Sequence, residues 1–242
     1  MIPTAYWWIG RPNFGDLLTP LLMAHFCETE VVWALRESAD MIMVGSLLDQ
    51  MPSDWAGLVA GAGQLHAKFL VDLPRATFLG VRGPLTAFSL GSRGKDLCIG
   101  DPGLLANELV QPTKEHVLGI VPHWSDIELE FRPEFKSFDP LIIRPSGDPI
   151  EVLRQIGSCR KIVSSSLHGI IVADAFGIPR RTEMAKIFVR EGGDYKFRDH
   201  AAAVGVPFKV GVTQQAPRYL IQDRQHELYD MLIALGKELK DR

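Results

Sequence analysis

His168 stands in a short segment whose residue types could bind an anion and transfer a proton. Three consecutive serines precede Leu167 and His168, and Gly169 follows them. A helix N-terminus beside an imidazole lowers its proton affinity, which keeps the pKa of His168 near the range useful for acid–base chemistry. Gly169 has no side chain and would allow a ligand to approach closely. We interpret His168 as a functional residue; a buried structural histidine is the alternative.

The residues around this segment indicate a strand, a turn and a helix in direct succession. Residues 161–163 include two β-branched side chains and are typical of a buried parallel strand. Residues 167–176 place apolar side chains on one helical face, and Gly177 and Pro179 end the helix. This order directs free backbone N–H groups and the positive end of the helix dipole toward the carboxyl edge of a sheet, which favours an anionic ligand there.

Arg82 is a second candidate, because the sequence places it where its charge needs a partner. Residues 76–81 are typical of a strand, and Pro84 fits the first turn of a following helix. Arg82 would then lie at a helix N-terminus, where its charge opposes the dipole. An anionic ligand would resolve that conflict, and Gly83 keeps the approach open. The alternative is an arginine paired with a structural carboxylate.

The strand expected at residues 117–121 delivers two further candidates, His123 and Trp124. Trp124 could offer a sugar ring a flat apolar surface with a polar edge, or it could belong to the core. Lys196, near the start of a later helix, could add a second cation. Two cationic side chains and a helix N-terminus suit a ligand with a phosphate and a carboxylate, and a histidine beside it suits proton transfer.

The chain begins with a similar strand–loop–helix unit. Residues 4–9 indicate a strand, and apolar spacing indicates a helix over residues 17–26. Asp16 is the expected N-cap of that helix, and Gly15 permits a tight turn before it. Asp101 likewise caps the turn or helix after a later strand, and a structural role suffices for it.

Strands that alternate with helices in this way predict parallel sheets with right-handed crossovers. The polar stretch 110–116 separates two such halves, and we take it as a linker. We therefore expect an α/β protein with two Rossmann-like domains, residues 1–112 and 113–217, that face each other across a cleft. Residues 218–242 are expected to form a long closing helix. That helix could serve a dimer, but packing across the two domains of its own chain is the expected role.

Composition narrows the class of protein. The 242 residues are 46% hydrophobic and 23% charged, as in soluble globular proteins, and a net charge of −3 without a basic stripe gives no support for a nucleic-acid partner. The three cysteines are odd in number and lie in apolar surroundings, which is typical of reduced cytoplasmic thiols.

No apolar run is long enough to span a membrane, and the N-terminus lacks signal-peptide features. No cluster has metal-ligand spacing. We expect a cytoplasmic protein without a metal. Peripheral contact of this protein with a membrane is compatible with its composition.

Six motifs occur along the chain in a specific order and spacing. They are Asn13-Phe14-Gly15-Asp16, Val81-Arg82-Gly83-Pro84, Gly100-Asp101-Pro102-Gly103, Pro122-His123-Trp124, Ser166-Leu167-His168-Gly169, and Gly192-Gly193 with Lys196-Phe197. Together they resemble the polysaccharide pyruvyl transferases, and within that family the bacterial exopolysaccharide ketal-pyruvate transferases. The resemblance runs from about the first strand to the helix after the second half.

The resemblance implies a fold similar to the GT-B glycosyltransferases and transfer of the pyruvyl unit of phosphoenolpyruvate to a sugar. The product would be a cyclic pyruvate ketal across two hydroxyls, with release of phosphate. The implied acceptor is a saccharide or lipid-linked oligosaccharide at the inner face of the plasma membrane. Phosphoenolpyruvate would be the donor substrate, with no further cofactor.

The resemblance also assigns roles to residues. His168 would be the essential histidine and transfer protons, with His123 as helper or acceptor contact, and Arg82 would hold the phosphate or carboxylate of the donor. Some family members carry an arginine directly before the Leu-His pair, where this chain has Ser166. That donor contact is then either absent or supplied elsewhere, with Arg144 and Lys196 as the candidates. The expected substrate-binding residues are Asn13, Asp16, His123, Trp124, Arg144, Ser166, Leu167, Gly169 and Lys196.

Two other functions stay open on sequence grounds. A glycosyltransferase that uses a nucleotide sugar would suit the same architecture, and Glu183 and Glu191 stand at the separation seen in some retaining enzymes of that fold. A non-catalytic module that binds a glycan or an anion is the other alternative. A comparison of phosphoenolpyruvate with nucleotide sugars separates the first from pyruvyl transfer. Phosphate release that needs both donor and acceptor excludes the second.

Overall fold

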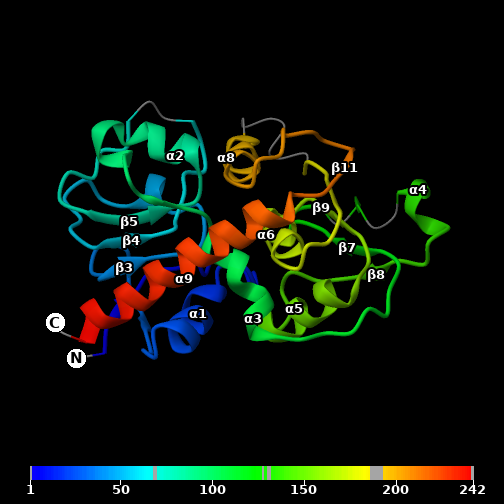
Figure 1. The fold of residues 1–242 in the computed structure, drawn as a ribbon, viewed down its shortest axis with the longest axis horizontal. Coiled ribbons are helices and arrows are strands. Elements are labelled where there is room, and N and C mark those ends of the chain that lie inside the picture. Colours follow the sequence, from blue (N-terminus) through cyan, green and yellow to red (C-terminus); the bar gives the residue numbers. More distant parts are fainter. Residues whose placement is uncertain (1, 68–69, 127, 130–131, 186–192, 241–242) are drawn as a thin grey trace.

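The structure is a computed structural model that describes residues 2–67, 70–126, 128–129, 132–185 and 193–240. It contains two sheets, one from each half of the chain (Figure 1). The mixed α/β class with parallel sheets and a long C-terminal helix is confirmed. The likeness to GT-B glycosyltransferases and the domain boundaries stay predictions. Glu191 and Gly192, which the sequence interpretation used, lie outside the described residues.

The first sheet has the strand order β2-β1-β3-β4-β5-β6, and all its neighbouring strands are parallel. Its strands are β1 (Thr4–Ala5), β2 (Val32–Trp33), β3 (Met41–Ile42), β4 (Leu58–Ala60), β5 (Thr77–Val81) and β6 (Cys98–Ile99). Successive residues of a strand point to opposite faces, so Met41 packs in the core on the side of α1 (Leu18–Phe26), and Ile42 on the side of α2 (Pro84–Ser89). Burial on both faces explains why the central strands are apolar throughout.

The second sheet has the order β11-β10-β9-β7-β8. Its strands are β7 (Gly119–Val121), β8 (Leu141–Ile142), β9 (Ile162–Ser164), β10 (Arg180–Thr182) and β11 (Thr213–Gln214). The pairs are parallel except β10 with β11, which is antiparallel. The short edge strands β2 and β11 were not expected, since two-residue strands leave no period-2 pattern in the sequence.

The other α-helices are α3 (Ala106–Leu109), α4 (Pro133–Lys136), α5 (Pro149–Ser158), α6 (Leu167–Ala175), α8 (Tyr195–Ala203) and α9 (Arg218–Lys240). The helix expected at residues 167–176 is confirmed as α6, which ends one residue earlier, and the expected closing helix is confirmed as α9. The 3-10 helices are η1 (Leu48–Gln50), η2 (Gly91–Gly94) and η3 (Pro102–Leu105). The strand expected at residues 4–9 pairs only over Thr4–Ala5, because the chain then leaves the sheet toward its carboxyl edge.

Helix α6 lies at the centre of the molecule, and every one of its residues is buried. The sequence indicated one apolar face, but the structure covers the helix on all sides. Strand β9 and helix α5 pack against it from the second half, and η3 packs against it from the first half. Burial on all sides agrees with the apolar run Ile170, Ile171, Val172 and Ala173 at the middle of the helix.

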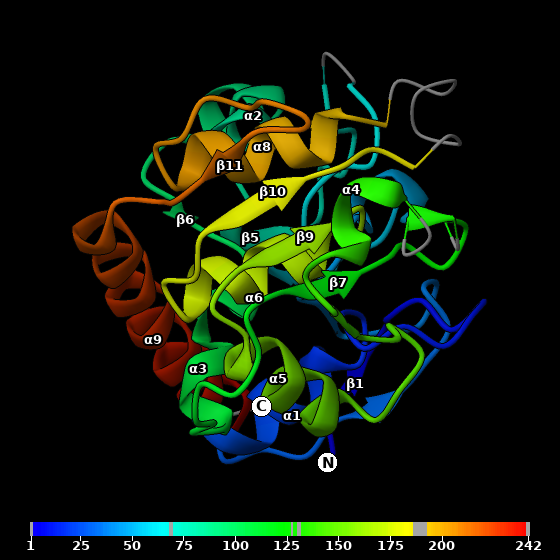
Figure 2. The same cartoon turned by 90° about the vertical axis from the view of Figure 1, so that its right-hand side faces the viewer.

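Helix α9 joins the two halves. It starts beyond the second sheet and runs back across α1, β6 and η3 of the first half (Figures 1 and 2). The Gln225 side-chain amide donates to the carbonyl oxygens of Leu104 and Ala175, one from each half. Gly236 lets the helix pack closely on α1, since a Cβ there would lie 2.7 Å from the Cys27 carbonyl oxygen. The contacts of α9 therefore lie across both halves of its own chain, as expected.

Helix α8 makes a second link between the halves, because it packs against α2 (Figures 1 and 2). One carboxylate oxygen of Asp199 accepts hydrogen bonds from the backbone N–H groups of Leu85 and Thr86, which open α2. The other accepts from the Thr86 hydroxyl and from Nε of Arg82, at 2.6 and 3.2 Å. The side chains of Arg82 and Asp199 are both 0% exposed. One carboxylate thus caps a helix and neutralises a buried arginine of the other half.

We expect Asp199→Ala to lower the free energy of unfolding by about 3–5 kcal/mol, because it leaves the Arg82 charge buried without a partner. Urea denaturation measures this loss. The matched control is Asp194→Ala on the same helix, which removes an exposed ion pair with Arg198 and should cost about 0–1 kcal/mol. A loss for Asp199→Ala as small as that of the control would contradict this assignment.

Candidate active site

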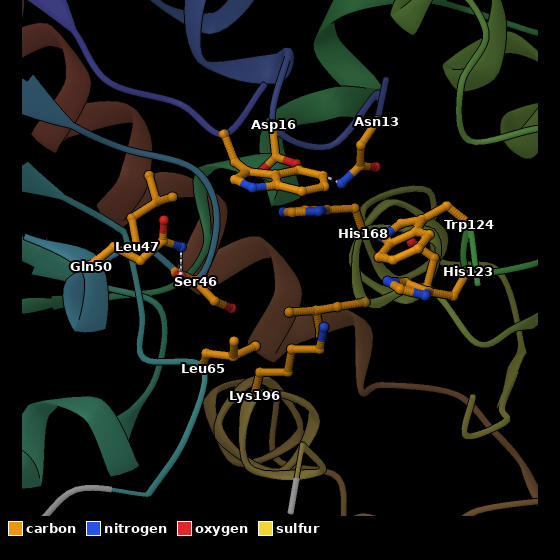
Figure 3. A pocket seen from close by; sticks show the side chains of 13 residues that line it. Asn13, Asp16, Ser46, Leu47, Gln50, Leu65, His123, Trp124, His168 and Lys196 are labelled. Carbon is orange, nitrogen blue, oxygen red and sulfur yellow. Dashed lines mark hydrogen bonds between the residues drawn. The ribbon is translucent and has the colours of Figure 1, made fainter. Parts of the chain in front are cut away.

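A cavity of about 280 Å³ lies between the two halves, at the carboxyl ends of their strands (Figure 3). The first half contributes Trp8, Asn13, Asp16, Ser46, Leu47, Gln50 and Leu65, and the second half contributes His123, Trp124, Ser166, Leu167, His168 and Lys196. Most residues singled out from the sequence therefore meet in one place. Arg82, Arg144 and Gly169 are absent from this lining. The parallel arrangement explains the convergence, since the carboxyl ends of parallel strands share one edge of a sheet.

His168 enters the cavity from the first turn of α6 and is 6% exposed. Its ring lies directly against the backbone of Gly15, where a Cβ would fall 2.0 Å from Nδ1. Gly15 is therefore required by the approach of His168. Burial, together with the charges of Lys196, Arg82 and His200, lowers the pKa of His168 to about 3. The imidazole is neutral at neutral pH, and burial rather than the helix dipole is the main cause.

Gly169 does not open the site to a ligand, in contrast to the sequence interpretation. A Cβ at this position would lie 2.3 Å from Oγ of Ser164 and 3.0 Å from Val121. Gly169 therefore allows α6 to pack closely on β7 and β9. Ser164 uses its hydroxyl within the turn, where it donates to the Val121 carbonyl and accepts from the Ser166 N–H. Ser166 and Leu167 are the residues of the turn that reach the cavity beside His168.

Arg82 lies behind the cavity rather than in its wall. Besides Asp199, its guanidinium donates to the Ser46 hydroxyl at 2.7 Å and to the Gln64 carbonyl. The structure thus shows the arrangement that the sequence interpretation held as the alternative, an arginine paired with a structural carboxylate. Its charge still acts in the cavity, because it lowers the pKa values of both His168 and Lys196.

Asp16 is 6% exposed and faces the cavity, where the Asn13 amide donates to Oδ2 at 2.6 Å (Figure 3). The expected N-cap role is wrong, because Leu17 occupies the N-cap position of α1 and no side chain caps that helix. Burial raises the pKa of Asp16 to about 7, although the Asn13 hydrogen bond and the charge of Lys196 act in the opposite direction. The carboxyl group therefore holds a proton for part of the time at neutral pH.

Lys196 reaches the cavity from the first turn of α8 and is 8% exposed. Burial lowers its pKa to about 7, Arg82 acts in the same direction, and Asp16 opposes the shift. Figure 3 shows His168 between Asp16 and Lys196. An anion in this cavity would stabilise the charged form of Lys196, so that binding would be coupled to proton uptake.

His123 and Trp124 lie where the two halves meet at the side of the cavity. Trp124 stacks on Trp8 with ring centroids 6.5 Å apart and an interplanar angle of 27°, and the guanidinium of Arg11 lies 4.9 Å from the Trp124 ring centre. The His123 backbone N–H donates to the Ser165 hydroxyl, and burial with the charge of Lys196 lowers the pKa of His123 to about 3. Both histidines of the cavity are therefore neutral.

Two other predicted residues lie elsewhere. Arg144 follows β8 and is exposed, outside the lining of this cavity. Glu183, considered for nucleotide-sugar chemistry, accepts hydrogen bonds from Arg132 at 2.7 Å and from Arg181, so its carboxylate is neutralised by two arginines. Glu191 lies outside the described residues.

The sequence interpretation missed several residues of the site. Trp8, Ser46 and Gln50 line the cavity, and Asp101, treated as a structural cap, has one carboxylate oxygen 3.9 Å from Nε2 of His168. Position carried the available signal for Trp8, which lies near the end of the strand predicted at residues 4–9 and therefore near the carboxyl edge of the sheet. Within the described part of the chain, no group of three His, Cys, Asp or Glu residues could hold a metal ion, and no helix is long and apolar enough to cross a membrane.

Comparisons with known proteins agree with the motifs. The sequence profile of the polysaccharide pyruvyl transferases matches residues 72–181, which include Arg82, Asp101, His123 and His168. The succinoglycan biosynthesis protein ExoV of Rhizobium meliloti (strain 1021) is 29% identical over 216 residues, which cover 84% of this chain and 65% of that protein. An uncharacterised protein of Acanthamoeba polyphaga mimivirus is 32% identical over 221 residues, which cover 83% of this chain and 74% of that protein. No solved structure matches the chain. The chain is therefore similar to the polysaccharide pyruvyl transferases, through the family profile over residues 72–181 and through ExoV.

Proposed function

We propose that the protein transfers the pyruvyl unit of phosphoenolpyruvate to two hydroxyls of a saccharide, forming a cyclic ketal and releasing phosphate. The cavity that joins Asp16, His168 and Lys196 carries this proposal, because it combines a proton donor, a neutral base and a cation within one small space. Similarity to the polysaccharide pyruvyl transferases and to ExoV supports a transferase that acts in exopolysaccharide synthesis. An acceptor at the inner face of a membrane, reached from the cytoplasm, is part of the same proposal.

Lys196 and the N-terminus of α6 bind the phosphate and carboxylate of the donor in this proposal. Both reach the cavity, whereas Arg144 does not, so Lys196 takes the place of the arginine that some pyruvyl transferases carry at the position of Ser166. Arg82 acts through space, since its buried charge adds positive potential behind the cavity while its guanidinium stays with Asp199.

Asp16 is the proton donor in the proposed reaction, because both cavity histidines are neutral at neutral pH and Asp16 retains a proton there. Asp16 protonates the methylene carbon of the donor, which becomes the methyl group and leaves cationic character at the central carbon. The first sugar hydroxyl attacks that carbon and gives its proton to neutral His168. The second sugar hydroxyl then attacks the same carbon and displaces phosphate. The departing phosphate takes the proton from His168, and the proton of the second hydroxyl passes to Asp16 and restores its acid form.

The paired Trp8 and Trp124 form the acceptor side of the proposed site. The apolar face of a sugar ring stacks on an indole, and the polar edge of the indole can meet a hydroxyl. The two rings come from different halves, so a sugar that rests on them lies across the junction and next to His168. Among the described residues, Glu183 does not support nucleotide-sugar chemistry, because its carboxylate accepts hydrogen bonds from two arginines.

We expect His168→Ala to lower turnover by about 10²- to 10⁴-fold, since the reaction loses the group that receives the hydroxyl proton. Mass spectrometry of acceptor saccharides after incubation with phosphoenolpyruvate measures the product, and phosphate release measures the rate. His226→Ala, at an exposed histidine of α9, is the control and should keep full turnover. Near-normal transfer by His168→Ala in a folded protein would remove His168 from the mechanism. Transfer from a nucleotide sugar in place of phosphoenolpyruvate would overturn the function itself.

The pH dependence tests Asp16. Asp16 has a pKa near 7 in the free protein, and a bound dianionic donor raises it further, so kcat should fall as the pH rises above neutrality and the carboxyl group loses the proton it must donate. In Asp16→Asn, turnover should drop and this dependence should disappear, while the binding of phosphoenolpyruvate persists. An unchanged profile of kcat against pH in Asp16→Asn would assign the proton donation to another group.

Lys196→Gln should raise the KM for phosphoenolpyruvate by about 10- to 150-fold, the loss expected for one charge-assisted hydrogen bond. Arg144→Gln is the matched comparison, because both residues were candidates for the same contact and only Lys196 lines the cavity. Steady-state kinetics with the donor varied separates them. A larger effect from Arg144→Gln than from Lys196→Gln would reverse the assignment.

A further inference from the structure

Two buried polar atoms without a hydrogen-bond partner among the described residues face each other beside the cavity. They are Nε2 of His168, from the second half, and Oδ2 of Asp101, from the first half. The atoms lie 3.9 Å apart, and the side chains are 7% and 0% exposed. A buried polar atom without a partner is costly, so two such atoms at this separation require a physical explanation.

The other oxygen of Asp101 is already engaged. Oδ1 accepts the Gly103 N–H at 2.9 Å, which caps η3, and η3 packs directly against α6. Capping needs only one carboxylate oxygen. With Oδ1 held in the cap, Oδ2 of Asp101 points toward His168. The capping role that the sequence indicated explains the contact of Oδ1 but not the position of Oδ2.

We propose that Asp101 is the positioning residue of His168: its Oδ2 accepts a hydrogen bond from Nε2–H, which keeps the proton on Nε2 and leaves the lone pair of the neutral imidazole on Nδ1. Nδ1 is the ring atom that lies against Gly15, in the loop that brings Asn13 and Asp16 to the cavity. A separation of 3.9 Å is longer than a hydrogen bond. An approach of about 1 Å between the halves when substrates bind would complete it, as is common for catalytic pairs in unliganded enzymes.

The charges around the pair are consistent with this role. Arg82, Lys196 and His200 surround His168, and each disfavours a second proton on the ring. Asp101 is influenced by Arg82, His200 and Asp199, and burial raises its pKa to about 6. The carboxyl group is therefore mainly ionised at neutral pH and can accept a hydrogen bond from Nε2. The base role of His168 rests on the proposed function, whereas the tautomer assigned to it does not.

The decisive variant is Asp101→Asn. The asparagine oxygen must take the Gly103 N–H to keep the cap, so its NH₂ group would face Nε2 and donate to it. The imidazole would then carry its proton on Nδ1, the opposite tautomer. Nitrogen-15 NMR of the imidazole, assigned by loss of the signal in His168→Gln, should show Nε2–H in the natural protein and Nδ1–H in Asp101→Asn.

Kinetics give the second readout. In Asp101→Asn, kcat should fall by about 10²- to 10⁴-fold with little change in the KM for phosphoenolpyruvate, since the wrong tautomer cannot accept the hydroxyl proton. Asp148→Asn is the matched control: Asp148 also precedes a proline and caps a helix through one oxygen, at 3.0 Å from the Glu151 nitrogen, but lies outside the cavity. It should leave both the His168 tautomer and kcat unchanged.

Several outcomes would overturn the inference. An Nδ1–H tautomer in the natural protein would do so even if Asp101→Asn failed to fold. So would an unchanged tautomer in Asp101→Asn, or turnover equal to that of Asp148→Asn. If the natural protein transfers nothing from phosphoenolpyruvate, the proposed function is overturned instead. The NMR measurement would still decide which nitrogen of His168 carries the proton.

Discussion

The buried ion pair between Arg82 and Asp199 is the interaction on which the geometry of the site depends. A guanidinium that is sealed from water needs a carboxylate, and the chain supplies it from the other half. This requirement brings α8 onto α2 and fixes how the halves face each other. Lys196 and Asp199 lie three residues apart on α8 and therefore on one face, so the contact that neutralises Arg82 also delivers Lys196 to the cavity.

Burial then sets the chemistry of the cavity. It keeps His123 and His168 neutral, keeps a proton on Asp16 for part of the time, and brings Lys196 close to losing its own. The empty cavity thus carries less charge than its residue types suggest. A small dianionic donor would reverse that balance, since it favours protonation of both Asp16 and Lys196. Donor binding would in this way load the acid that the reaction consumes.

The sequence predicted the site better than the role of each residue in it. Strand–turn–helix units end at one edge of a parallel sheet, so His123, His168 and the loop with Asp16 could be expected to converge. Predictions from neighbouring residues failed where a residue far along the chain determines the contact of a side chain. The carboxylate that neutralises Arg82 lies 117 positions further along the chain. The cap expected from Asp16 is absent for a local reason, since its carboxylate accepts a hydrogen bond from Asn13. Gly15 was predicted to permit a tight turn and Gly169 to admit a ligand, but in the structure they make room for the side chains of His168 and Ser164.

The measurement that tests the central claim most directly is calorimetric titration of the protein with phosphoenolpyruvate, slightly above neutral pH, in buffers of different ionisation enthalpy. If Asp16 and Lys196 share the cavity with the donor, phosphoenolpyruvate binds and the complex takes up protons from the buffer. Binding without proton uptake, or heat from nucleotide sugars and none from phosphoenolpyruvate, would contradict the account.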